Sequence, residues 1–308
     1  MSNISIDNRF ASICGITEEE LRRDFQEDIR ELGEANGMTA EDAARSLKEW
    51  FDGYHFTEEC EDIYNPFSLL NTFAEKKFGN YWFQTGTPTF LVEVLKRNKY
   101  NLHRLTEEMA TSSSLNGIDT MERDPVPLLY QSGYLTIKGF NKRFRYYTLG
   151  FPNKEVEEGF VRFLLPRYAS IRPGGLAFEI VHFVTEVRSG DIDGFMRRLQ
   201  GFFVDTPYEL ARDLELHYQN VLFIVFKLLG FYTRAEYHTS QGRVDLVVQT
   251  DNYIYVMEFK LEGTAEEALQ QINEKQYALP FTADPRRLYK IGVNFSAALR
   301  GIEKWVVE

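Results

Sequence analysis

The stretch GRVDLVVQTDNYIYVMEFK, residues 242–260, contains two short apolar segments that carry charged residues. Side chains alternate between the two faces of a strand. In the second segment, one face receives Ile254, Val256, Glu258 and Lys260, and the other receives Tyr253, Tyr255, Met257 and Phe259. Both faces are mostly apolar, which is typical of a central strand covered on both sides. The sequence therefore predicts a buried strand whose C-terminal end carries a glutamate and a lysine.

The first segment contains an aspartate, Asp245, on the face opposite to that of Val244 and Leu246. Burial of three ionisable groups is costly unless they pair with one another or bind a metal. One interpretation is a salt bridge between an acid and Lys260 at the end of the sheet. The other is a divalent metal site, because carboxylate oxygens suit Mg²⁺ or Mn²⁺. In a metal site, the lysine would orient the attacking water or stabilise developing charge.

The elements around this stretch predict an α/β domain. Their expected order is helices at about 177–188, 191–203 and 207–229, strands at 231–238, 243–249 and 253–261, a helix at 264–277 and a strand at 288–295. Helices that flank a run of strands pack on the faces of the resulting sheet. The segment 169–175, ASIRPGG, has the composition of a linker, so the expected domains are 1–168 and 176–308.

Two helices contribute further polar candidates. Gln271 and Lys275 lie on one flank of the helix after the charged strand, where they suit the positioning of water or phosphate. Glu215 and Gln219 lie one turn apart in the long helix before the strands. Glu215 either completes a metal's coordination or belongs to a solvated polar face. Tyr277 either stacks on a base or packs in the core.

The N-terminal 168 residues predict an α-rich module. Helix starts are indicated by Thr17 with Glu20, Thr39 with Asp42, Asn65 before Pro66, and Thr87 before Pro88. Two strands, at 134–140 and 144–149, follow the helices and precede another helix, an order that favours a winged-helix-like unit. Its hairpin carries Lys138, Lys142, Arg143 and Arg145. These cations either contact nucleic acid or form a solvated face.

Composition limits the possible functions. The chain has 308 residues, 44% of them hydrophobic, and a net charge of −11. The acidic balance argues against tight nonspecific binding of phosphate, but carboxylates that hold a metal are themselves acidic. Cys14 and Cys60 form neither a metal-type spacing nor a disulfide framework. Because no apolar run reaches about 18 residues and the start is unlike a signal peptide, we expect a cytoplasmic protein without membrane contact.

The order of acidic and basic residues over 205–300 resembles the PD-(D/E)xK nuclease superfamily, whose restriction-endonuclease-like core is α-β-β-β-α-β. The resemblance implies a Mg²⁺- or Mn²⁺-dependent nuclease that cleaves DNA or RNA. It assigns the metal to Asp245, Glu258 and the backbone carbonyl of Phe259, catalysis to Lys260, and water positioning to Gln271. Glu215 would be the helix glutamate, with Glu236 as its rival. The candidates for contact with nucleic acid are Arg243, Lys275 and Tyr277.

Several phrases also look like a bacterial family that couples an AAA-ATPase-like region to a C-terminal PD-(D/E)xK domain. They are YNPFSLL (64–70), YWFQTGTPTFL (81–91), PLLYQSGYLTIK (127–138), YTLGFPNKEV (147–156) and YVMEFK (255–260). The chain departs from that family because it has no G-x-x-x-x-G-K-[ST] loop. We therefore expect no ATP hydrolysis by this chain alone, and an ATPase partner or a homo-oligomer. The alternative to a nuclease is a non-catalytic binding or regulatory module of nuclease fold.

Overall fold

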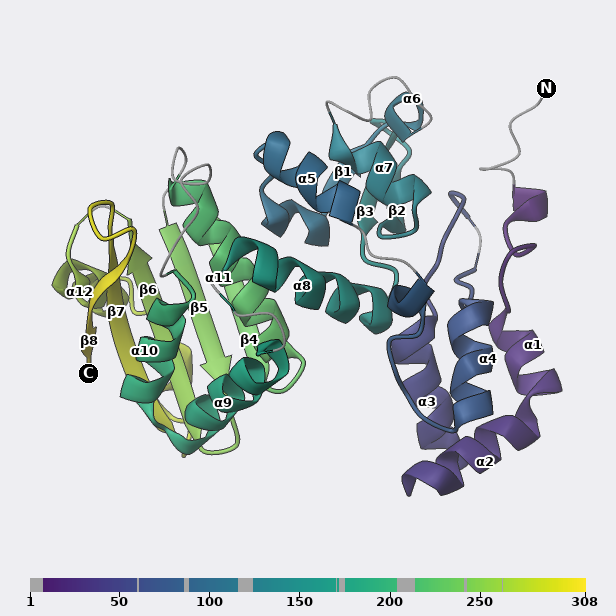
Figure 1. Cartoon of the computed structure of the whole chain (residues 1–308), viewed down its shortest axis with the longest axis horizontal. Coiled ribbons are helices and arrows are strands. Elements are labelled where there is room, and N and C mark those ends of the chain that lie inside the picture. The colour runs from purple at the N-terminus through teal and green to yellow at the C-terminus, as the bar shows by residue number, and fades with distance from the viewer. Residues whose placement is uncertain are drawn as a thin grey trace. The chain divides into compact units, whose positions relative to one another are not determined.

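The computed structural model describes residues 8–59, 61–85, 89–115, 124–169, 171, 175–203, 214–240, 243–261 and 263–308. These residues belong to two compact units, one within 8–160 apart from 101–103, and the other comprising 101–103 and 161–308 (Figure 1). Both units combine helices with a sheet, which confirms the expected mixed α/β class. The units divide inside a helix, whereas the sequence placed a linker at 169–175, of which the structure describes 169, 171 and 175.

The first unit begins with four helices around one apolar core. They are α1 (Glu18–Asp24), α2 (Gln26–Asn36), α3 (Ala40–Phe51) and α4 (Pro66–Glu75), after a short 3-10 turn at Asn8–Phe10. Thr17 and Glu20 form the predicted capping box of α1, and the side chain of Asn65 caps α4. Thr39 caps α3 through the backbone N–H of Asp42. Thr87 and Pro88 lie outside the described residues.

The same unit continues with short helices and a three-stranded sheet. Its elements are α5 (Thr89–Arg97), β1 (Glu108–Ala110), α6 (Ser112–Leu115), α7 (Pro125–Gln131), β2 (Thr136–Asn141), β3 (Tyr146–Gly150) and α8 (Lys154–Tyr168), with 3-10 turns at Trp82–Thr85 and Leu102–Thr106. The sheet is antiparallel in the order β1-β3-β2. The predicted hairpin is therefore present, whereas β1 was not expected. The winged-helix-like assignment of this unit stays a prediction.

Lys138 connects the inner end of this hairpin to two backbone carbonyls. Lys138 Nζ donates hydrogen bonds to the carbonyl oxygens of Pro152 at 2.9 Å and Gly53 at 3.3 Å. Burial lowers the pKa of the Lys138 ammonium below its usual value. Gly53 has φ +112°, and a Cβ there would lie 2.2 Å from the Pro152 oxygen. These bonds make Lys138 part of the fold rather than a free surface cation.

The second unit contains a five-stranded sheet with helices on both faces. Its elements are α9 (Leu176–Ser189), α10 (Ile192–Gly201), α11 (Leu214–Gly230), β4 (Arg234–Ser240), β5 (Arg243–Gln249), β6 (Tyr253–Lys260), α12 (Ala265–Glu274), β7 (Arg287–Ser296) and β8 (Gly301–Val307), with a 3-10 turn at Leu279–Phe281. The strand order is β4-β5-β6-β7-β8. Only the β6–β7 pairing is parallel among these described strands. The strand β8 was not predicted.

The two faces of β6 pack as the alternation of the sequence predicts. Ile254 and Val256 form a buried cluster with Ile272 of α12. On the opposite face, the Phe259 ring lies 6.2 Å from that of Phe226 in α11. The sheet is thus covered on both sides, and the strands can be followed between their helices in Figure 1. This double cover explains why β6 is apolar on both faces.

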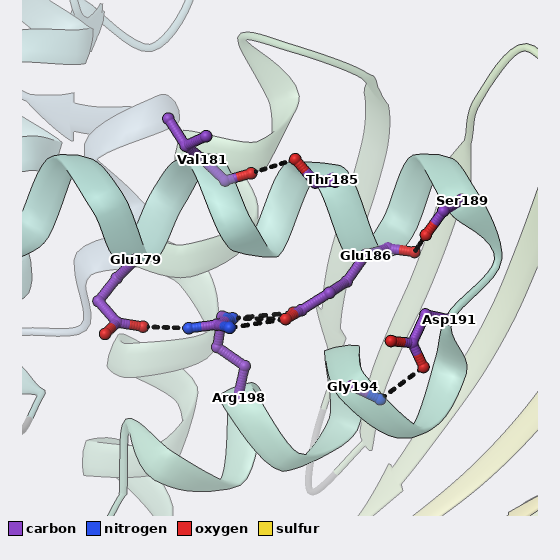
Figure 2. A network of polar contacts seen from close by, with 8 residues as sticks. All are labelled: Glu179, Val181, Thr185, Glu186, Ser189, Asp191, Gly194 and Arg198. Atoms are coloured by element: carbon purple, nitrogen blue, oxygen red, sulfur yellow. Dashed lines mark hydrogen bonds and ion pairs between the residues drawn. The ribbon is translucent and has the colours of Figure 1, made fainter.

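An arginine joins α9 to α10 on the α11 side of the sheet. The guanidinium of Arg198 lies between Glu179 and Glu186, as Figure 2 shows. Its three hydrogen bonds to Glu186 measure 2.6, 2.8 and 3.0 Å. At the start of α10, Asp191 accepts a hydrogen bond from the backbone N–H of Gly194 at 2.9 Å. Charged hydrogen bonds of this kind hold the turn between the two helices in one geometry.

Candidate active site at the end of strand β6

Backbone pairing brings the predicted site positions together at one end of the sheet. In the antiparallel register of β5 and β6, Asp245 lies opposite Glu258. In the parallel register of β6 and β7, Glu258 lies beside Gly292 and Lys260 beside Asn294. Opposite positions of paired strands belong to the same face of a sheet. The backbone therefore places the positions of Asp245, Glu258 and Lys260 on the face that α12 covers.

A glutamine connects the acid and the lysine of this face. The side-chain N–H of Gln271 donates to Glu258 Oε1 at 2.6 Å. The Gln271 carbonyl oxygen accepts a hydrogen bond from the Lys260 ammonium. Glu258 is fully buried, with 0% of its surface exposed, whereas Lys260 and Gln271 are half-buried. One amide thus holds a buried carboxylate and an ammonium at a fixed separation.

The sequence of α12 explains why Gln271 reaches this place. Thr264 and Glu267 form a capping box that starts the helix directly after β6. Ala265, Ala268 and Ile272 are its buried positions. Gln271 lies three residues after Ala268, on the flank of the buried stripe nearest to Glu258. The sequence pattern predicted this flank, and the hydrogen bonds of Gln271 to Glu258 and Lys260 give its geometry.

The side chains of Asp245, Arg243 and Glu236 lie outside the described part of the structure. Among the described residues, no group of three or more His, Cys, Asp or Glu side chains is placed to hold a metal. The backbone nevertheless places Asp245 directly opposite the buried carboxylate of Glu258. Two carboxylates and a backbone carbonyl are the hard oxygen donors that Mg²⁺ and Mn²⁺ prefer, so the donor set fits the expected ion.

Glu215 lies at the same end of the sheet, on a different helix. Tyr218, one turn further along α11, stacks on Phe295 with ring centroids 4.4 Å apart. Phe295 directly follows Asn294, the β7 neighbour of Lys260, so α11 begins near the end of β6. The Glu215 side chain is exposed and accepts a hydrogen bond from Gln219 at 3.2 Å. Its predicted part in metal binding stays a prediction.

The candidates for contact with nucleic acid occupy different surroundings. Lys275 is exposed and forms the C-cap of α12, where its backbone N–H donates to the Gln271 carbonyl at 3.0 Å. Tyr277 packs against the buried cluster that includes Ile254 and Ile272. This packing favours the core interpretation of Tyr277 over base stacking.

Sequence reasoning missed an amide on β7, the strand next to Lys260, and a carboxylate on β8, the strand beyond it. Asn294 is only 7% exposed, and its side-chain N–H donates to Glu303 Oε2 at 3.0 Å. The register changes from Asn294 opposite Lys304 to Phe295 opposite Ile302, so Glu303 is the extra residue of a β-bulge. Bulges change the direction of a side chain and are frequent beside active sites. An asparagine inside the apolar run IGVNFS was the signal available in the sequence.

Comparison with known proteins supports the class of the second unit. Residues 213–305 match the family described as the PD-(D/E)XK nuclease superfamily. They include Glu258, Lys260 and Gln271, together with the bulged residue Glu303. A PD-(D/E)XK superfamily domain at 213–305 is therefore supported, whereas no comparison supports the expected AAA-ATPase-like relationship.

The whole chain is similar to one curated protein, described as "Uncharacterized protein in vnfD 5'region", from Azotobacter chroococcum mcd 1. The two are 32% identical over 320 aligned residues, which include all of this chain. The chain spans 59% of the length of that relative. No solved structure matches. No helix among the described residues has the length and apolar character needed to cross a bilayer.

Proposed function

We propose that this chain is a metal-dependent nuclease that hydrolyses phosphodiester bonds of nucleic acid, with DNA as the expected substrate. The observation that carries the proposal is the Gln271 side chain, which is hydrogen-bonded both to buried Glu258 and to Lys260. A buried acid and a lysine at a strand end are costly to maintain for structure alone. Their position inside the superfamily match supports a catalytic use.

The proposed site uses Mg²⁺ or Mn²⁺, held by Asp245, Glu258 and the backbone carbonyl of Phe259. Such an ion would polarise the phosphate and lower the pKa of the attacking water. Glu215 would supply a further carboxylate from α11. Arg243 and Lys275 would contact the phosphates on either side of the cleaved bond, because arginine and lysine are the usual partners of phosphate.

The chain's own side chains have distinct tasks in the reaction. Gln271 fixes the Glu258 carboxylate through its N–H and the Lys260 ammonium through its carbonyl oxygen. Lys260 would orient the water and stabilise the charge that develops on the phosphate. The water gives up a proton to the solvent as its oxygen bonds to phosphorus, and the bond from phosphorus to the leaving sugar oxygen breaks. The leaving oxygen takes up a proton, so the products are a phosphate monoester end and a hydroxyl end.

The test is cleavage of plasmid DNA, single-stranded DNA and RNA in Mg²⁺, in Mn²⁺ and in EDTA. We expect metal-dependent cleavage that Glu258→Gln and Lys260→Ala each abolish. Lys290→Ala is the matched control, because Lys290 lies on the α12 face of neighbouring β7, where it bonds to Asn273 and Glu308, away from Lys260. Cleavage that persists in the Lys260→Ala protein, or in EDTA, would contradict the proposal.

A second candidate is a non-catalytic module of nuclease fold that works with an ATPase partner. It is favoured by the acidic balance of the chain, whose net charge of −11 opposes phosphate binding. In that case Glu258 and Lys260 would serve the fold alone. Glu258→Gln would then lower the free energy of unfolding equally with and without Mg²⁺, and wild-type protein would cleave none of the three substrates.

A further inference from the structure

The tip of the β2–β3 hairpin is a rigid turn with the sequence Lys142-Arg143-Phe144-Arg145. The side-chain oxygen of Asn141 accepts hydrogen bonds from the backbone N–H groups of Arg143 at 3.1 Å and Phe144 at 3.0 Å. The Arg145 N–H donates to the Asn141 carbonyl at 2.7 Å. Because these bonds fix the backbone, the four side chains project from a preformed loop.

This loop exposes an aromatic ring between two arginines. Phe144 is 66% exposed. The Arg143 guanidinium carbon lies 5.3 Å from the centre of the Phe144 ring, within the range of a cation–π contact. The hairpin residues on either side of the tip stay packed, with the Phe140 ring of β2 4.8 Å from the Tyr147 ring of β3. The exposed ring is therefore a feature of the tip and not of the whole hairpin.

The charges at the tip are only partly neutralised by the protein. Lys142 forms an ion pair with Glu59 at 2.6 Å, and Tyr147 donates a hydrogen bond to neighbouring Glu58. Neither Arg143 nor Arg145 takes part in an ion pair between described residues. In a chain with a net charge of −11, this leaves two adjacent positive charges available for an anionic ligand.

We propose that residues 142–145 form a contact site for single-stranded nucleic acid, in which Phe144 stacks on an unpaired base and Arg143 and Arg145 contact the flanking phosphates. An aromatic ring beside cations is the usual combination for binding single strands. A duplex hides the faces of its bases, so an exposed ring gains little from it. The inference rests on the proposed function for its ligand, and it specifies unpaired strand as the form that the first unit binds.

The test measures binding of the full chain in EDTA, so that cleavage plays no part. Fluorescence anisotropy follows a labelled 20-nucleotide oligothymidine and a 20-base-pair duplex. We expect Phe144→Ala to weaken binding of the single strand about 10-fold, because the variant loses the ring on which an unpaired base stacks. The same substitution should change duplex binding less than about twofold. A double variant, Arg143→Gln with Arg145→Gln, should lower the slope of log affinity against log salt by about 1.4, or about 0.7 for each lost phosphate contact.

Two matched controls come from the second unit. Phe178 of α9 is 71% exposed, so Phe178→Ala removes an equally exposed ring. The Arg287 guanidinium lies 4.8 Å from the Tyr289 ring centre, so Arg287→Gln removes a similarly stacked cation. Both should leave binding of the oligothymidine unchanged. Circular dichroism and thermal melting of every variant should match the wild type, because the substituted side chains are exposed.

The outcomes separate this inference from the proposed nuclease function. Glu258→Gln should abolish cleavage, and Phe144→Ala should weaken oligothymidine binding in that background as it does in the wild type. Wild-type binding of oligothymidine without cleavage of any substrate would overturn the nuclease and leave the contact site standing. Three results would overturn the contact site. They are wild-type affinity for oligothymidine in Phe144→Ala, an equal loss of that affinity in Phe178→Ala, and no binding of the single strand by the wild type.

Discussion

Gly292 lies beside Glu258 on the neighbouring strand, and the absence of a side chain at Gly292 lets α12 approach the sheet at this point. A Cβ at this position would lie 2.1 Å from the carbonyl oxygen of Ala265 and 2.5 Å from the backbone nitrogen of Leu269. Both atoms belong to the α12 backbone, which cannot move aside as a flexible side chain does. The close approach is what places Gln271 within hydrogen-bond distance of Glu258.

Gly292→Ala should therefore push α12 away from the sheet. We expect the free energy of unfolding to fall by about 1–3 kcal/mol, because added volume in a packed contact forces the backbone to shift. Urea denaturation followed by circular dichroism measures this change. Gly201→Ala in α10 is the control, since a Cβ there meets nothing within 4 Å, and it should leave stability unchanged or slightly higher. Equal effects of the two substitutions would contradict the role of Gly292.

Gln271→Ala should lower kcat of the proposed nuclease about 10- to 100-fold, because the loss of a residue that hydrogen-bonds to a metal ligand has an effect of this size. Steady-state cleavage in Mn²⁺ gives kcat and KM, and a Mn²⁺ titration followed by electron paramagnetic resonance gives the metal affinity. Gln270→Ala is the control on the same helix, because Gln270 bonds to exposed Glu274. We expect that variant to keep wild-type kcat.

Gln271→Glu separates the two hydrogen bonds of the glutamine. It keeps an oxygen for the Lys260 ammonium but replaces the donor to Glu258 by a second carboxylate. Like charges at this distance favour protonation of one of them. Without metal, we expect Gln271→Glu to be less stable than Gln271→Ala at pH 8, and Mn²⁺ to restore more stability to the glutamate variant. Equal melting temperatures of the two variants, with and without Mn²⁺, would contradict this account of the site.

Arg198→Met should destabilise the second unit, because it leaves Glu186 without its charged partner between α9 and α10 (Figure 2). Arg198 is only partly exposed, so we expect a loss of about 1–3 kcal/mol in the free energy of unfolding. Arg197→Met, at the adjacent exposed position, should change stability by less than about 0.5 kcal/mol. Thermal melting at two salt concentrations measures the stability of both variants. Equal losses of stability would show that the bonds of Arg198 to Glu186 do not stabilise the second unit.

The buried carboxyl of Glu155 predicts that the stability of the first unit depends on pH. The carboxyl is fully buried, and burial raises its pKa above the usual value, although the backbone N–H of Trp82 donates to it at 2.9 Å. The folded state therefore binds the proton more tightly than the unfolded state. This contribution to stability is complete below the unfolded pKa of 4.5 and is lost as the pH rises through the folded pKa.

Glu155→Gln keeps an oxygen acceptor for Trp82 and removes the ionisation. We expect the variant to gain stability relative to the wild type as the pH rises from 4.5 to 7.5, as measured by urea denaturation at both values. Glu93→Gln at an exposed position of α5 is the control. A difference between Glu155→Gln and wild type that stays constant with pH would contradict the pKa direction.

The parts of the site that follow from local periodicity were predictable. Alternation along β6 places Glu258 and Lys260 on one face, and the packing of Ile254 and Val256 on α12 confirms that face. The hydrogen bonds of Gln271 were not predictable in geometry, because they depend on how closely α12 approaches Gly292. The residues that were missed depend on pairing between distant strands. Glu303 reaches Asn294 only because of a bulge between β7 and β8, and β8 itself combines charged and apolar residues without a clear alternation.

The parallel pairing of β6 with β7 has a consequence for how the site could be moved between proteins. Glu258, Lys260, Gln271 and Gly292 all belong to one continuous strand–helix–strand segment, 253–296. A recombination event that transfers this segment would carry the acid, the lysine, the bridging amide and the glycine together, in a unit with a defined handedness of crossover. The partner aspartate position, Asp245, lies on the preceding strand β5, outside this segment. The host protein would therefore have to supply an equivalent aspartate of its own.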